Sequence, residues 1–111
     1  MRLRADIYVA ALIRRAQVEG AYATLRRRGA AEAGAIFVRV DRLDGTSALF
    51  GPASQSEIND DGDRLFRRMH EDEWIDNLSV EDRIRREMKF DPDLWIVDIE
   101  DRKGRDFFSA G

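Results

Sequence analysis

The stretch AIFVRVDRLDGTSALF, residues 35–50, decides the fold. In residues 35–43 apolar side chains alternate with other residues, and this period of two predicts a β-strand. Asp44-Gly45 is a turn signal typical of hairpins, so residues 46–50 are predicted to return as an antiparallel strand. One face of the first strand carries Ile36, Val38 and Val40. The chain is therefore expected to be organised around a β-hairpin.

Residues 4–19, upstream of the hairpin, predict a helix that Gly20 ends, because they are rich in good helix formers and contain no Gly or Pro. One broad apolar face includes Leu12 and Ile13. A second apolar stripe consists of Ile7, Ala11 and Val18. A helix with so wide an apolar circumference is buried on more than one side, and a second subunit is one candidate for the second cover. Residues 21–28 allow a longer helix or, as Gly20 favours, a strand.

The chain beyond the hairpin begins with a loop. Residues 53–63 are polar, acidic and rich in turn-forming residues, which predicts a flexible connection. Residues 64–70 predict a further strand. Residues 71–78 are ambiguous, because the helical spacing of their apolar residues is interrupted at Asn77.

Ser79 is predicted to cap a second helix, and Pro92 disfavours its continuation past Phe90. Residues 94–100 then alternate again and predict a last strand. The element order is typical of an α+β fold: an N-terminal helix, an antiparallel sheet of about four to five strands, and a second helix before the last strand. We expect a single domain over residues 1–111, with both helices on one sheet face.

Composition excludes several classes of protein. The 111 residues contain no cysteine, which excludes a disulfide scaffold, a thiol nucleophile and a zinc site built on thiolates. No apolar run approaches the roughly 20 residues that a membrane helix needs. The apolar run after Arg2 and Arg4 is short and lacks the cleavage site of a signal peptide. A cytoplasmic protein without a membrane partner is therefore expected.

Two segments carry a resemblance to a known family: AGAIFVRVDRLDGTSALFGPA, residues 33–53, and FDPDLWIVDIEDRKGRDFF, residues 90–108. Together with residues 4–29 they resemble a small bacterial family of unknown function, found mainly in alphaproteobacteria. The resemblance covers nearly the whole chain. It implies that residues 21–28 form a strand and continue into a hairpin through 29–34. It implies no catalytic or binding residue, because none is established for that family.

Candidate catalytic and metal-binding residues are few. His70 precedes an acidic run, but a strand would send it and Glu71 to opposite faces, so no metal site and no cofactor are expected. Asp98 and Glu100 lie two apart on one strand, as paired carboxylates of an acid–base enzyme can. The simpler interpretation turns them outward against Arg39 or Arg67 on a neighbouring strand. No catalytic residue is therefore predicted, and an enzyme stays a lesser alternative.

Arginine supplies 17 of the 19 positive charges. If the strand at 21–28 pairs with the strand at 35–43, several arginines converge into a patch that is able to bind single-stranded nucleic acid. The candidate contact residues are Arg26, Arg27, Arg28, Arg39 and Arg42. Cross-strand ion pairing is the competing interpretation.

The leading hypothesis is a small non-enzymatic protein-interaction domain that forms a homodimer. Residues 1–52 carry a net charge of +4 and residues 53–111 carry −7, so the two halves attract each other within or between chains. The interface is expected on the first helix or the last strand. Near the C-terminus, Phe107 and Phe108 dock on the chain itself, which we favour, dock on a partner, or stay exposed as a contact patch. The candidate interface residues are Leu12, Ile13, Phe107 and Phe108.

Overall fold

The computed structural model describes residues 3–53 and 64–108. The elements are α1 (Ala5–Val18), β1 (Tyr22–Arg27), β2 (Ile36–Asp41), β3 (Thr46–Pro52), β4 (Phe66–Arg68), β5 (Ile75–Asp76), α2 (Asn77–Phe90) and β6 (Trp95–Glu100). The α+β class and both predicted helices are confirmed. The loop predicted at 53–63 lies, apart from its first residue, outside the described residues.

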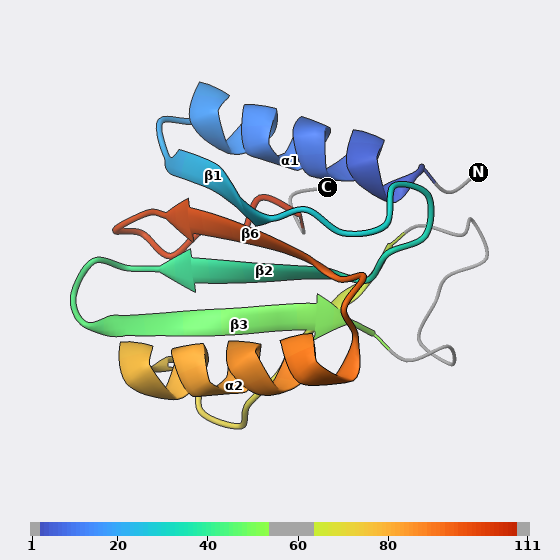
Figure 1. Cartoon of the computed structure of the whole chain (residues 1–111). Coiled ribbons are helices and arrows are strands. Elements are labelled where there is room, and N and C mark those ends of the chain that lie inside the picture. Colours follow the sequence, from blue (N-terminus) through green and yellow to red (C-terminus); the bar gives the residue numbers. More distant parts are fainter. Residues whose placement is uncertain (1–2, 54–63, 109–111) are drawn as a thin grey trace.

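In the described residues the sheet is mixed and has six strands, where an antiparallel sheet of four or five was expected. Figure 1 shows β1, β6, β2 and β3 side by side in this order. β4 follows β3 at the edge, and β5 also pairs with β3. All pairs are antiparallel except β2 with β6. The predicted hairpin between β1 and β2 is wrong, because β6 lies between them. The physical reason lies in the connection through α2. It is long enough to return the chain to the other end of the sheet, so β6 can insert next to β2 and run parallel to it.

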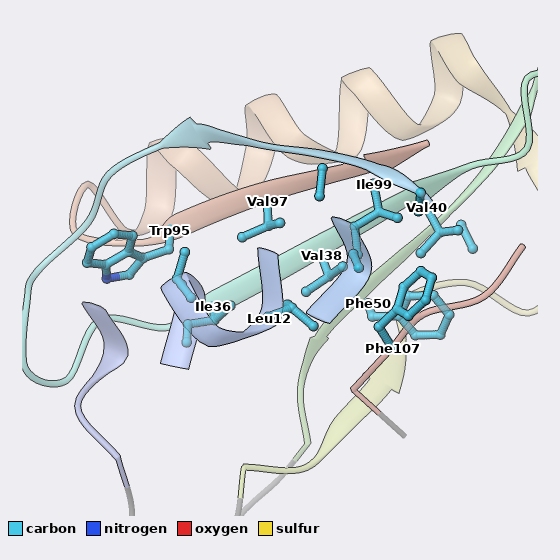
Figure 2. Packing of buried hydrophobic residues seen from close by; sticks show 14 of the residues in the cluster. Leu12, Ile36, Val38, Val40, Phe50, Trp95, Val97, Ile99 and Phe107 are labelled. Atoms are coloured by element: carbon cyan, nitrogen blue, oxygen red, sulfur yellow. The ribbon is translucent and has the colours of Figure 1, made fainter. Parts of the chain in front are cut away.

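One face of the sheet packs against α1. The helix buries Ala5, Val9, Leu12 and Ala16. These side chains meet alternate residues of the two central strands, which Figure 2 shows from close by. The strand residues are Ile36, Val38 and Val40 from β2 and Trp95, Val97 and Ile99 from β6. Each fully buried side chain of this size contributes about 1.5–3 kcal/mol relative to an exposed one.

The opposite face packs against α2, through Val80 and Ile84. Their partners are the intervening strand residues Phe37, Leu49, Leu94 and Ile96. The expectation that both helices cover one face is therefore wrong: α1 and α2 lie on opposite sides (Figure 1). The central strands are apolar on both faces, as strands between two layers of helix are.

Local backbone chemistry sets the element ends. Gly20, with a φ of 90°, ends α1, and its N–H donates to the carbonyl of Gln17. The N-cap of α2 is Asp76, whose carboxylate accepts from the Ser79 N–H at 3.0 Å, so the helix begins before the predicted cap at Ser79. β3 continues past residue 50 to Pro52, because β4 pairs with its last residues.

No helix within residues 3–53 and 64–108 is long and apolar enough to cross a membrane.

Candidate functional site

Two of the five candidate arginines meet on the α2 side of the sheet. Arg26 lies on β1 and Arg39 on β2, with β6 between them. Both guanidinium groups reach the carboxylate of Glu81 in the first turns of α2, at 2.7 Å from Arg26 and 3.1 Å from Arg39. These bonds lower the pKa of Glu81, the hydrogen bond with Arg26 first. The sequence does not predict this role, because an acidic residue such as Glu81 is common near a helix N-terminus for other reasons.

Asp98 of β6 lies between the two arginines. It is directly opposite Arg39 in the parallel register, as expected, but its ion-pair contact is with Arg26. The alternative partner Arg67 lies on β4, which β2 and β3 separate from β6. Its Oδ2 is 3.8 Å from Arg26, and its buried Oδ1 accepts no hydrogen bond from any described residue. Burial raises the pKa of Asp98, and the attraction of Arg26 and Arg39 opposes this without cancelling it.

We call Arg26, Arg39, Asp41, Glu81 and Asp98 the charged cluster. Arg39 completes it through a 3.8 Å contact with Asp41. The cluster holds two cations and three carboxylates, so it presents no excess positive charge to a phosphate backbone. The cluster links β1 and β2 to α2 through Glu81 and links β6 to β1 through Asp98, so it forms an internal ion-pair network.

The remaining three arginines lie apart. Arg27 donates to the carbonyl of Pro92 at 2.8 Å. Arg28 lies over the Trp95 ring, 5.3 Å from its centroid. Arg42 donates to Thr46 Oγ1 and lies 4.1 Å from the centroid of Trp74. The five arginines therefore do not form the single patch that a β1–β2 hairpin would have made.

His70 has a structural position. Its Nε2 accepts the Leu49 backbone N–H at 3.0 Å, and its Nδ1 lies 2.6 Å from the carbonyl oxygen of Asp72. Within the described ranges, no group of three or more His, Cys, Asp or Glu side chains is arranged to hold a metal ion. Glu100 lies on the same strand face as Asp98, but it takes no part in the charged cluster.

The candidate interface residues lie in or against the core of their own chain. Leu12 and Phe107 are buried, at 1% and 5% exposure, while Ile13 and Phe108 are half-buried and pack against the same cluster. The ring of Phe108 stacks on Phe66, with centroids 4.3 Å apart. The two phenylalanines therefore dock in cis.

The second apolar stripe of α1, in contrast, is not covered by any of the residues that the structure describes. Ile7 is 50% exposed and Val18 is 76% exposed, and Ala11 is exposed between them. The stripe points away from the sheet, because the residues that face the sheet are those of the other stripe. β6, the alternative location for an interface, is a central strand with a neighbour on each side.

Comparison with known proteins gives consistent matches. The DUF1491 family, described as a protein of unknown function, matches residues 3–109. The crystal structure of a DUF1491 family protein from Caulobacter crescentus CB15 is 41% identical, with a TM-score of 0.81 over 98% of this chain and 95% of that one. An NMR structure of a DUF1491 family protein from the same organism is 43% identical, with a TM-score of 0.80 over 98% and 94%. A solution structure of an A. tumefaciens protein is 39% identical, with a TM-score of 0.77 over 90% and 86%. No curated protein matches.

Proposed function

The chain belongs to the DUF1491 family of proteins of unknown function, and from its surface we propose that it is a small, non-enzymatic protein-interaction domain that forms a homodimer. The interface is the second apolar stripe of α1 together with Arg14, which lies on the same line of the helix. We call these four residues, Ile7, Ala11, Arg14 and Val18, the outer stripe. The observation that carries the proposal is the exposure of Ile7 and Val18 on a helix that already buries its opposite stripe.

The outer stripe suits a second copy of itself. Its members are three or four residues apart and so lie along one line of the helix. Ala11 lies near the middle, where a small side chain lets two helix axes approach. In an antiparallel pair, Ile7 of one copy lies toward the C-terminal half of the other, and opposite helix-dipole ends come together. An isologous interface of this kind closes as a dimer.

The expected dimer is weak. Fourteen residues of helix span about 21 Å, and one stripe of that length buries less than the roughly 1,200–2,000 Å² of a stable interface. Dimer formation should therefore depend on concentration. Other protein partners of the stripe would compete with the second copy.

The test is size-exclusion chromatography with light scattering over a concentration series. The wild-type mass is expected to rise from 12.8 kDa toward twice that value. The double variant Ile7→Glu/Val18→Glu should stay monomeric with an unchanged circular dichroism spectrum. The matched control is Leu78→Glu/Phe90→Glu, two exposed apolar residues of α2, which should dimerise as the wild type does. A wild type that is monomeric at millimolar concentration contradicts the proposal.

Absorbance at 260 and 280 nm in the same run addresses the alternative of single-stranded nucleic-acid binding. The geometry supports that alternative less, because Arg26 and Arg39 are paired with Glu81 and the other candidate arginines lie apart. Co-eluting nucleic acid that salt removes would favour it over self-association.

A further inference from the structure

An open cleft of about 400 Å³ lies at the end of the sheet where α1 turns into β1 and where β6 ends. We call it the end cleft. Its lining includes Gly20, Tyr22, Leu43, Glu100, Arg102 and Lys103. The volume falls in the range of small-molecule sites. No residue of the charged cluster lines the end cleft, although Asp41 of that cluster borders it, and no sequence motif pointed to the cleft.

The apolar walls of the end cleft are Tyr22 and Leu43, which are 64% and 44% exposed. Leu43 has a φ of 64°, a left-handed conformation that is unfavourable for leucine. Asp41 holds it there, since its Oδ1 accepts the Leu43 N–H at 2.8 Å. The turn therefore holds the exposed Leu43 side chain at the cleft in a strained backbone conformation. Strained residues of this kind are often found at ligand-binding sites.

The polar floor of the cleft is fixed by an ion pair. Arg105 donates from Nε and Nη2 to the two carboxylate oxygens of Asp101, each at 3.0 Å, and also from Nη2 to the carbonyl of Glu19. Asp101 is buried, and its bonds to Arg105 lower its pKa. These two charges neutralise each other and hold the turn after β6 against the end of α1.

The other charges of the cleft are uncommitted. Glu100, Arg102 and Lys103 form no side-chain hydrogen bond or ion pair with any residue of the described chain, although Lys103 lies close enough to Asp101 to attract its carboxylate. The residues that line the cleft carry three cations against two carboxylates, and Arg105 also lies 4.0 Å from the carboxylate of Glu19, outside the lining, so the cations without an ion-pair partner among the described residues are Arg102 and Lys103. An aromatic wall beside free cations matches a ligand that has a flat apolar body and a negative group.

We propose that the end cleft binds a small aromatic anion, with its ring against Tyr22 and Leu43 and its carboxylate or phosphate near Arg102 and Lys103. The site is independent of self-association through α1, since none of these residues belongs to the outer stripe. Arg102 and Lys103 supply the charge selectivity, and Tyr22 supplies the contact area.

The experiment is a ¹H–¹⁵N NMR titration with 2-naphthoate, with the uncharged 2-naphthamide as the charge control. Residues 20–22, 43 and 100–105 are expected to shift together, and 2-naphthamide should bind about tenfold more weakly. Tyr22→Ala should weaken binding of 2-naphthoate about tenfold, whereas Tyr22→Phe should retain it. Lys103→Gln should reduce the preference for the anion.

Matched controls separate a site from unspecific adsorption. Phe90→Ala removes an aromatic ring that is 88% exposed elsewhere, and Lys89→Gln removes the only other lysine, so both should leave the titration unchanged. The variant spectra must keep the wild-type dispersion. The proposal is overturned if 2-naphthoate at millimolar concentration causes no shift, if the shifts centre on Phe90, or if Tyr22→Ala binds as tightly as the wild type.

Discussion

Arg26 of the edge strand β1 and Glu81 of α2 are 55 residues apart in the sequence and form a two-point ion pair across β6. Within residues 3–53 and 64–108, β6 is the only strand that pairs with β1. The ion pair therefore attaches the edge strand to α2, on the opposite face from α1, which Gln17 also joins to β1 by a hydrogen bond to the Ala23 carbonyl. Arg39 shares the same carboxylate, so one side chain of α2 serves two strands.

Removing Glu81 should destabilise the protein more than removing a neighbouring acid. Glu81→Ala leaves Arg26 and Arg39 without their main partner, and we expect the free energy of unfolding to fall by about 1–3 kcal/mol. Asp82→Ala is the control, since Asp82 pairs only with Arg85 and both are well exposed; its effect should stay within about 0.5 kcal/mol. Urea unfolding measures both. Equal losses would show that the charged cluster adds no stability.

Asp98 and Asp101 should respond to pH in opposite directions. Burial raises the pKa of Asp98 in the folded protein, so its ionisation opposes folding and Asp98→Asn should increase stability at pH 7. Arg105 lowers the pKa of Asp101, so its ionisation favours folding and Asp101→Asn should decrease stability at pH 7.

The stability difference between each variant and the wild type should become smaller as the pH falls. The gain from Asp98→Asn fades between the raised pKa of Asp98 and the ordinary aspartate value, below which the wild-type carboxyl is neutral in both states. The loss from Asp101→Asn fades below the ordinary value, down to the lowered pKa of Asp101. Urea unfolding at several pH values checks this. The same sign for both variants at pH 7 would contradict the assigned environments.

Because the C-terminal segment packs on its own chain, Phe107→Ala should destabilise the protein far more than Phe90→Ala. Phe107 is 5% exposed, and its carbonyl accepts from Arg15 at 2.7 Å, whereas Phe90 is 88% exposed. Phe107→Ala should cost about 3–5 kcal/mol, and Phe90→Ala should stay within about 0.5 kcal/mol. Thermal unfolding compares them. Small effects for both would mean that the segment does not contribute to the core.

Most elements were predictable because their signals are local, whereas β5 lies in residues 71–78, which the sequence left ambiguous. Gly20 marks the end of α1, the Asp44-Gly45 turn marks the β2–β3 hairpin, and Pro92 marks the end of α2. Strand order was not predictable, because it depends on where the crossover returns β6. One feature of the sequence did indicate a central position for β6. Leu94 and Ile96 are apolar and alternate with the apolar residues of the other face, which is typical of a strand covered on both sides.

The candidate site shows the same contrast between local features, which could be predicted, and features that depend on the fold, which could not. The proximity of Asp98 and Arg39 could be predicted, because charged residues on neighbouring strands commonly pair. The part played by Glu81 could not, because it depends on the position of α2 over the sheet. Arg28 and Arg42 were misplaced in one patch with Arg26 because β1 was paired with the wrong strand.

Two glycines should differ sharply in their tolerance of alanine. A Cβ on Gly29 would lie 2.2 Å from the carbonyl oxygen of Asp93 and 2.7 Å from that of Leu94, so the backbone leading into β6 would have to move. A Cβ on Gly45 would meet no atom within 4 Å, and only its φ of 92° is unfavourable for alanine. We expect Gly29→Ala to cost about 2–3 kcal/mol or more and Gly45→Ala about 1 kcal/mol, because backbone overlap cannot be relieved by a side-chain rotation. Urea unfolding of the two variants measures the difference, and an equal cost would mean that the 29–34 loop is not packed against the start of β6.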